Sequence, residues 1–223
     1  MYHWDFGSLW EYRQLIAIGF AFTLVYTAVC VVLGLAVGLV VAVGRLSSRA
    51  WLSLPLRAYV ELFRCTPVLV QLVWIYYALP IVSGIEISAT TAAVLTLTLY
   101  GGAFYSEIMR GGIVSIESGQ GEAARALGMR RWQVMRRVVL PQAFSRMLPA
   151  LMNQSIIQLK NTSLLSILAV PDLLYQGQTI AHQTYRPLEA YTMVAIAYFI
   201  VLFPATLLAR HFELHHEARL NGE

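Results

Sequence analysis

The stretch LIAIGFAFTLVYTAVCVVLGLAVGLVVAVG, from Leu15 to Gly44, contains 30 residues and no charged side chain. A helix that crosses the hydrocarbon core of a bilayer needs about 20 apolar residues, each rising 1.5 Å. The stretch therefore predicts a membrane-spanning helix with length to spare for tilt. The whole chain agrees, because 58% of its residues are hydrophobic and only 13% are charged, whereas a soluble domain has roughly 25% charged residues.

Further apolar segments predict additional spans. Cys65–Ile85, Ile87–Ser106 and Ala190–Ala209 lack charged residues and are each long enough to cross. The apolar stretch 138–170 differs, because it holds Arg146 and Lys160 and exceeds one crossing, so a break is expected near residues 161–163. The prediction is one all-α integral membrane domain, 1–223, whose five transmembrane helices cover 15–43, 61–80, 87–109, 141–161 and 189–210.

Arginine placement predicts the orientation of these helices. The connection 44–58 has three arginines and no acid, and the connection 110–137 has six arginines against two glutamates. The connections 81–90 and 171–189 carry no such excess. Because basic loops stay in the cytoplasm, the N-terminus is expected outside and the C-terminus inside. Arginines that alternate between loops in this way also argue against nucleic-acid binding.

The sequence lacks the motifs that are typical of several function classes. The single lysine, Lys160, follows Leu159, so the chain has no phosphate-binding P-loop. No catalytic motif or paired metal-ligand spacing is present. Cys30 and Cys65 are expected to be small apolar side chains rather than a redox pair. The N-terminus lacks the basic and apolar regions of a signal peptide. The chain is therefore not expected to be an enzyme or to hold a cofactor.

The basic connection contains a short segment suited to binding a partner. Glu122 to Leu127 predicts a helix, with Glu122 near the positive end of its dipole and Gly128 ending it as a C′ glycine. The small side chains Ala123, Ala124 and Ala126 keep this helix narrow enough to enter a cleft. Pro141 is expected in the first turn of the next helix. On composition alone, an ordinary cytoplasmic loop helix is an equal alternative.

The spacing of this segment resembles a known family. Glu122-Ala123-Ala124, three residues, Gly128, nine residues, Val138, one residue and Leu140-Pro141 follow the signature loop of permease subunits of ABC importers, with Val138 where isoleucine is usual. Four other segments resemble the polar amino acid branch of the type I importers, which covers histidine, glutamine and glutamate/aspartate permeases. They are 61–71, 105–113, 159–166 and 170–173, and the resemblance extends over roughly 15–211.

That resemblance implies a function and a set of partners. The loop 110–140 would dock on an ABC ATPase through the coupling residues Glu122, Ala123, Ala124, Arg125, Ala126, Leu127 and Gly128. The chain would form half of a translocation pathway in a bacterial inner membrane, with an identical or related second permease. Two ATPase subunits would hold the ATP and Mg²⁺, an extracytoplasmic binding protein would deliver the amino acid, and lipid would surround the assembly.

Three amides are candidates for the cargo path. Gln154, Gln158 and Asn161 fall at i, i+4 and i+7 and so share one helix face, with Lys160 and Thr162 beside them. Related permeases for cationic amino acids have acids at the positions matching Gln154 and Asn161, so amides favour a neutral or acidic cargo. Helix-to-helix hydrogen bonding is the alternative role for the amides, and snorkelling to the interface is the alternative for Lys160.

Other patterns bear on packing and on rival functions. Gly34 and Gly38 form a GxxxG motif that would let another helix approach closely, although chance matches are common in such a run. Glu61 with Arg64, and Glu107 with Arg110, are spaced for surface salt bridges. A secondary transporter would need intramembrane acids, which the uncharged spans lack. A membrane enzyme and a non-transporting structural subunit are the remaining alternatives.

Overall fold

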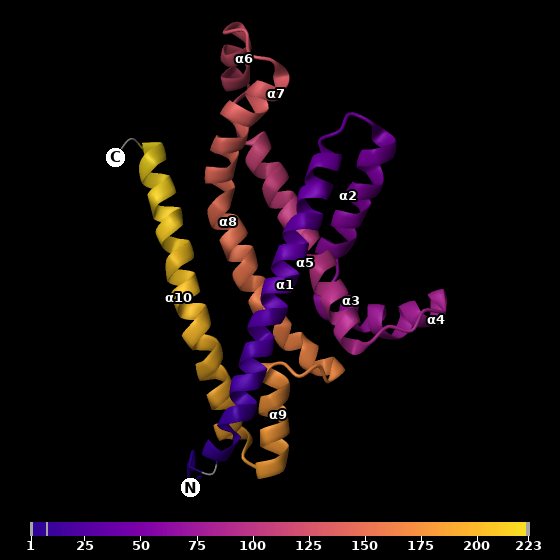
Figure 1. The fold of residues 1–223 in the computed structure, drawn as a ribbon, viewed down its shortest axis with the longest axis vertical. Coiled ribbons are helices and arrows are strands. Elements are labelled where there is room, and N and C mark those ends of the chain that lie inside the picture. The colour runs from indigo at the N-terminus through magenta and orange to yellow at the C-terminus, as the bar shows by residue number, and fades with distance from the viewer. Residues whose placement is uncertain (1, 8, 222–223) are drawn as a thin grey trace. The chain divides into compact units, whose positions relative to one another are not determined.

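The computed structural model describes residues 2–7 and 9–221, and in these residues the regular structure is entirely helical (Figure 1). An all-α fold was predicted and is confirmed. The α-helices are α1 (Arg13–Arg45), α2 (Ala50–Cys65), α3 (Val68–Val73), α4 (Leu79–Ser83), α5 (Ala89–Val114), α6 (Ser118–Ala126), α7 (Arg131–Val134), α8 (Leu140–Asn161), α9 (Leu173–Thr184) and α10 (Pro187–Asn221). Short 3₁₀ segments cover Trp10–Tyr12 and Thr162–Leu168.

Two helical segments of the described chain are long and apolar enough to cross a membrane on their own, Trp10–Arg45 and Pro187–Leu214. A third span results if α2 and the helical run Val68–Ser83 count as one broken crossing. Helices α5 and α8 have 26 and 22 residues, so they are long enough, but threonines, glycines and charged residues dilute their apolar character. Five spans and their orientation therefore stay a prediction.

Proline accounts for three departures from regular helix. The helix expected over 61–80 is broken at Thr66–Pro67, where Pro67 adopts φ −63° and ψ 135°, because a proline disfavours helical geometry in the residue before it. Two π-helical turns, Trp74–Ala78 and Met135–Val139, each end two residues before a proline. There the Leu79 and Leu140 N–H groups bond back five residues, which widens the helix just ahead of the ring.

The chain divides into two packing units. The first comprises Met1–Val32, Thr66–Thr98 and Ser155–Thr206. Its core cluster joins Leu9 and α9 residues Ile180 and Ala181 to Ala190 at the start of α10. Asp172 caps α9 by accepting from the Tyr175 N–H at 2.8 Å, and burial raises the pKa of Asp172 to about 6. The Leu173 N–H donates to Thr23 Oγ1 at 3.0 Å, which ties the start of α9 to α1.

A polar cluster in this first unit was not predicted from the sequence. The Glu189 side chain is fully buried and accepts from the Tyr2 hydroxyl and, at 3.1 Å, from the Asp5 N–H. Arg186 adds a 3.2 Å ion pair to Glu189 and donates to the His3 carbonyl at 3.4 Å. The hydrogen bond to Glu189 raises the pKa of the Tyr2 phenol. The N-terminal segment is thereby held against the start of α10.

The second unit comprises Leu33–Cys65, Leu99–Gln154 and Leu207–Glu223. Figure 1 shows α2 running back beside the end of α1. The core cluster of this unit joins Val41, Val60, Phe63 and Ala103 from α1, α2 and α5. The Tyr59 hydroxyl of α2 donates to the Leu99 carbonyl of α5 at 2.5 Å, so α2 is fixed by a polar contact as well as by packing.

The GxxxG motif of α1 packs directly on α5 within the second unit. A Cβ atom added at Gly38 would lie 2.7 Å from Tyr105 Cβ and 3.2 Å from the Gly102 carbonyl oxygen. One added at Gly34 would lie 3.2 Å from the Tyr105 ring. The two glycines therefore allow the helix backbones to approach closely, as the motif predicts.

Candidate functional site

The predicted coupling segment forms a helix that ends in a complete Schellman motif. Helix α6 spans Ser118–Ala126, and Gly128 follows with φ +83°. The Gly128 N–H donates to the Arg125 carbonyl at 2.9 Å, and the Met129 N–H donates to the Ala124 carbonyl at 3.2 Å. These are the two bonds that define the motif. The prediction that Gly128 ends the helix as a C′ residue is confirmed.

The start of α6 differs from the prediction. The helix begins at Ser118, four residues before Glu122, and its first turn holds no acidic side chain. Glu117 occupies the N-cap position without a side-chain hydrogen bond. The expected interaction of Glu122 with the positive end of the helix dipole is therefore wrong, because that effect is confined to the first turn. The Glu122 side chain is instead exposed.

Helix α6 packs by one side and leaves the other open. Ala124 is buried, and Val134 of α7, against which α6 packs, is buried too. Glu122, Ala123, Arg125, Ala126 and Gly128 are exposed, and the Leu127 side chain is 85% exposed. Trp132 adds a further exposed apolar side chain at the start of α7. A small helix whose open side carries apolar, acidic and basic side chains is suited to enter a groove on another protein.

The loop is joined to α8 without a break in the helix. Helix α7, the π-helical turn Met135–Val139 and α8 follow one another directly from Arg131 to Asn161. Pro141 is the second residue of α8, but because the helix already runs on from Arg131, it lies inside a continuous helix rather than at the free helix start that was predicted. The Gln142 side chain donates to the Val138 carbonyl, one turn before it, at 3.0 Å.

An ion cluster in the second unit joins α1, α2 and α5. Glu107 pairs with Arg45 of α1 and with Arg110 one turn along α5, and Arg64 of α2 lies 4.0 Å from it. The Arg45 side chain is only 8% exposed. Both predicted i,i+3 pairs are present, Glu61–Arg64 at 4.0 Å and Glu107–Arg110. The convergence of Arg45 and Arg64 on Glu107 was not predicted, because it joins residues far apart in the sequence.

The three candidate amides all lie on α8, and each keeps an unpaired buried atom. Gln154 is 4% exposed and its Nε2 has no partner in the described residues. Gln158 is fully buried, donates from Nε2 to the Leu97 carbonyl at 2.7 Å, and leaves Oε1 unpaired there. Asn161 Nδ2 likewise has no partner in the described residues. Gln158 therefore takes part in the helix-to-helix bonding considered above, while all three retain unused hydrogen-bonding capacity.

The two neighbours of the amides lie in different surroundings. The Lys160 side chain is exposed. Thr162 is fully buried and donates from Oγ1 to the Leu159 carbonyl at 2.6 Å. Helix α8 ends at Asn161 and continues as the 3₁₀ segment Thr162–Leu168, so the break expected near residues 161–163 is confirmed.

Comparisons with known proteins agree with this architecture. The family model described as "Binding-protein-dependent transport system inner membrane component" matches residues 31–215. The glutamine transport system permease protein of Escherichia coli strain K12 is 37% identical over 211 residues, which cover 94% of this chain and 96% of that protein. The glutamate/aspartate import permease of E. coli O6:H1 is 34% identical over 220 residues, covering 96% and 98% respectively.

Solved structures show the same fold. A crystal structure of an amino acid ABC transporter with histidines matches with a TM-score of 0.89 at 37% identity, covering 96% of this chain and all of that one. Inward-facing structures of a methionine ABC transporter share the fold at 23% identity, with a TM-score of 0.71. The match over most of the chain confirms the resemblance seen in the motifs: the chain belongs to the family of binding-protein-dependent transport system inner membrane components, the permease subunits of type I ABC importers.

Proposed function

We propose that this chain is the permease of an ATP-driven importer and couples to its ATPase through α6. The observation that carries the proposal is the geometry of α6: its end is fixed by the Gly128 cap, while Glu122 and Leu127 are exposed. In the proposed assembly five helices cross a bacterial inner membrane, with the N-terminus outside and the C-terminus in the cytoplasm. Two ATPase subunits hold ATP and Mg²⁺, and docking on α6 transmits their movement.

The chain would form half of a translocation pathway. A second permease, identical or related, would supply the other half, and an extracytoplasmic binding protein would deliver the cargo. The relatives are permeases for glutamine and for glutamate/aspartate, and α8 carries amides rather than acids at Gln154 and Asn161. These observations support a polar, neutral or acidic amino acid as cargo.

The coupling role predicts a selective loss of ATPase binding. Glu122→Lys and Gly128→Val are each expected to lower the amount of co-purifying ATPase about tenfold. The first reverses an exposed charge on α6, and the second forces a β-branched residue to φ +83°, where such residues are strained by about 1–2 kcal/mol. Pull-down of the assembled importer through a tagged permease measures the loss, and substrate-stimulated ATP hydrolysis in vesicles gives a second reading.

Two variants serve as matched controls for this experiment. Gly128→Asn should retain the ATPase, because asparagine tolerates the left-handed conformation. Glu86→Lys makes the same charge reversal as Glu122→Lys at an exposed position outside the loop, and should have no effect. Full ATPase binding and full stimulated hydrolysis in both test variants would refute the coupling role.

The amides predict which amino acids are accepted. Gln154→Glu and Asn161→Asp together are expected to shift the uptake ratio of arginine to glutamine by at least about tenfold, because a charge at a desolvated contact is of order 1.4 kcal/mol or more. Radiolabelled uptake into vesicles measures the ratio. Gln142→Glu on the same helix is the control, since its side chain bonds to the Val138 carbonyl near the loop. An unchanged ratio in the double variant would contradict a role for these positions in reading cargo charge.

A further inference from the structure

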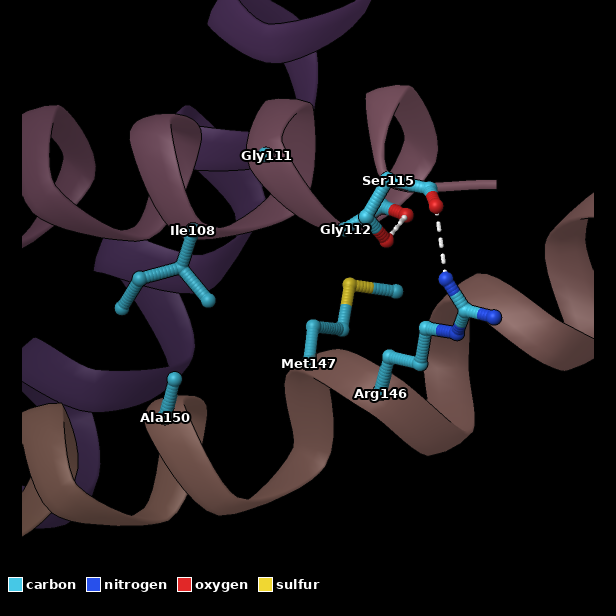
Figure 2. A pocket seen from close by; sticks show the side chains of 7 residues that line it. All are labelled: Ile108, Gly111, Gly112, Ser115, Arg146, Met147 and Ala150. Atoms are coloured by element: carbon cyan, nitrogen blue, oxygen red, sulfur yellow. Dashed lines mark hydrogen bonds between the residues drawn. The ribbon is translucent and has the colours of Figure 1, made fainter. Parts of the chain in front are cut away.

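A surface groove in the second unit lies between the last turns of α5 and the first half of α8 (Figure 2). Its volume is about 470 Å³ and it is open to the surface, so it suits a ligand that lies along the protein rather than one that is enclosed. The residues that line the groove are Ile108, Gly111, Gly112, Ser115, Arg146, Met147 and Ala150. It adjoins the basic loop, and none of the candidate amides on α8 lines it.

The groove combines an apolar lining with one cation. Figure 2 shows Ile108, Met147 and Ala150 around the space and the Arg146 guanidinium at one end, bonded through Nη1 to the Ser115 carbonyl at 2.6 Å. The Ser115 hydroxyl donates to the Gly112 carbonyl at 2.8 Å. In the described residues no protein acceptor meets Arg146 Nε or Nη2. The rest of the guanidinium is open to the surroundings, so its remaining donors are available to an anionic ligand group.

The remaining lining distinguishes between anions. An amino acid carries an ammonium group beside its carboxylate, and this groove offers no carboxylate or amide side chain to accept from it. A phospholipid needs only a cation for its phosphate and apolar surface for its acyl chain. Arginine matches phosphate geometry with paired donors, and basic pockets between helices on the cytoplasmic side suit acidic lipid head groups.

We propose that this groove binds an anionic phospholipid of the cytoplasmic leaflet, with its phosphate on Arg146 and an acyl chain along Ile108, Met147 and Ala150. The assignment to that leaflet rests on the proposed orientation, which the arginine-rich loop beside the groove supports. A lipid at this place contacts both helices that flank the coupling loop, α5 before it and α8 after it. Lipid composition would therefore affect the same helices that lead into α6.

Native mass spectrometry of the full importer tests the site. Complexes are prepared in phosphatidylglycerol or in phosphatidylcholine with the same acyl chains, and the lipid retained per permease is counted. We expect phosphatidylglycerol to be retained in preference, and Arg146→Gln to reduce its retention about tenfold, the order expected for loss of a charge-assisted contact. Gly111→Leu should reduce it too, because Gly111 lines the groove and a Cβ added there meets no protein atom within 4 Å.

Controls make each outcome decisive. Arg57→Gln removes an exposed arginine of α2 outside the groove and should leave retention unchanged. Equal retention of the two lipids, wild-type retention in Arg146→Gln, or displacement of the lipid by free glutamate would each overturn the proposal. So would a disulfide between two permeases carrying Ala150→Cys, because the groove would then face the second permease. The measurement needs neither transport nor ATP hydrolysis, so its failure leaves the coupling proposal intact.

Discussion

Replacing Gly38 by alanine should lower the melting temperature of the purified chain by about 5 °C or more. In an open helix this change is favourable by roughly 1 kcal/mol. Here the new methyl group would lie 2.7 Å from Tyr105 Cβ and 3.1 Å from the Ser106 backbone nitrogen. Backbone atoms cannot rotate away, so α1 and α5 must separate, and overpacking of this kind destabilises by about 1–3 kcal/mol. For a chain of this size about 2 kcal/mol corresponds to a shift of several degrees.

The melting temperature is measured by heating the protein in detergent and quantifying the remaining folded protein by size-exclusion chromatography. Gly119→Ala makes the same chemical change in α6, where an added Cβ meets nothing within 4 Å, and should be neutral or slightly stabilising. Gly38→Leu should prevent accumulation of folded protein altogether. If Gly38→Ala were as stable as Gly119→Ala, the close approach of α1 to α5 would be disproved.

Glu107→Gln is expected to produce a second large loss of stability. The change leaves Arg45, Arg64 and Arg110 without the carboxylate on which they converge. The Arg45 side chain is 8% exposed and that of Glu107 is 22% exposed, so water replaces the lost partner only in part. The cost is expected near the lower end of the about 3–5 kcal/mol for breaking a buried pair. The same thermal assay should show a shift of roughly 10 °C.

The structure provides a matched control and a rescue for this prediction. Glu61→Gln removes an acid that is 60% exposed and 4.0 Å from Arg64, and exposed pairs contribute about 0–1 kcal/mol. Combining Glu107→Gln with Arg45→Gln should recover part of the loss, since the stranded buried charge is removed with its partner. A double variant less stable than Glu107→Gln alone would argue that Arg45 acts through packing instead.

The sequence predicted features that depend on neighbouring residues. Gly128 as a helix terminator, the break after Asn161 and the i,i+3 ion pairs follow from local geometry, and each is confirmed. The membrane class followed from the uncharged run at Leu15, from the other apolar segments and from the low share of charged residues. The start of α6 was misplaced because Ser118, Gly119 and Gly121 have weak helix propensity, although α6 includes them.

The features that were missed join distant parts of the chain or follow from proline. Nothing local in the sequence indicates that Arg45 meets Glu107 or that Tyr2 meets Glu189, because one sequence contains no information on which far residues pack together. The break in the helix at Pro67 could have been predicted from the sequence, since a residue before proline rarely stays helical. The apolar character of 61–80 outweighed that signal. The sequence does not show that the helix widens into a π-helical turn ahead of Pro80 and of Pro141.

The unpaired amide atoms of α8 have a consequence for biogenesis. Each buried polar atom without a partner lowers stability by about 1–3 kcal/mol, and Gln154, Gln158 and Asn161 each hold one. A newly inserted chain is thus less stable than its apolar packing alone would make it. In the proposed importer, a neighbouring subunit or the cargo that supplied those hydrogen bonds would stabilise the chain as it binds. Orphaned copies should therefore be preferred targets of membrane proteolysis, which would help keep the subunits of the importer in balanced amounts.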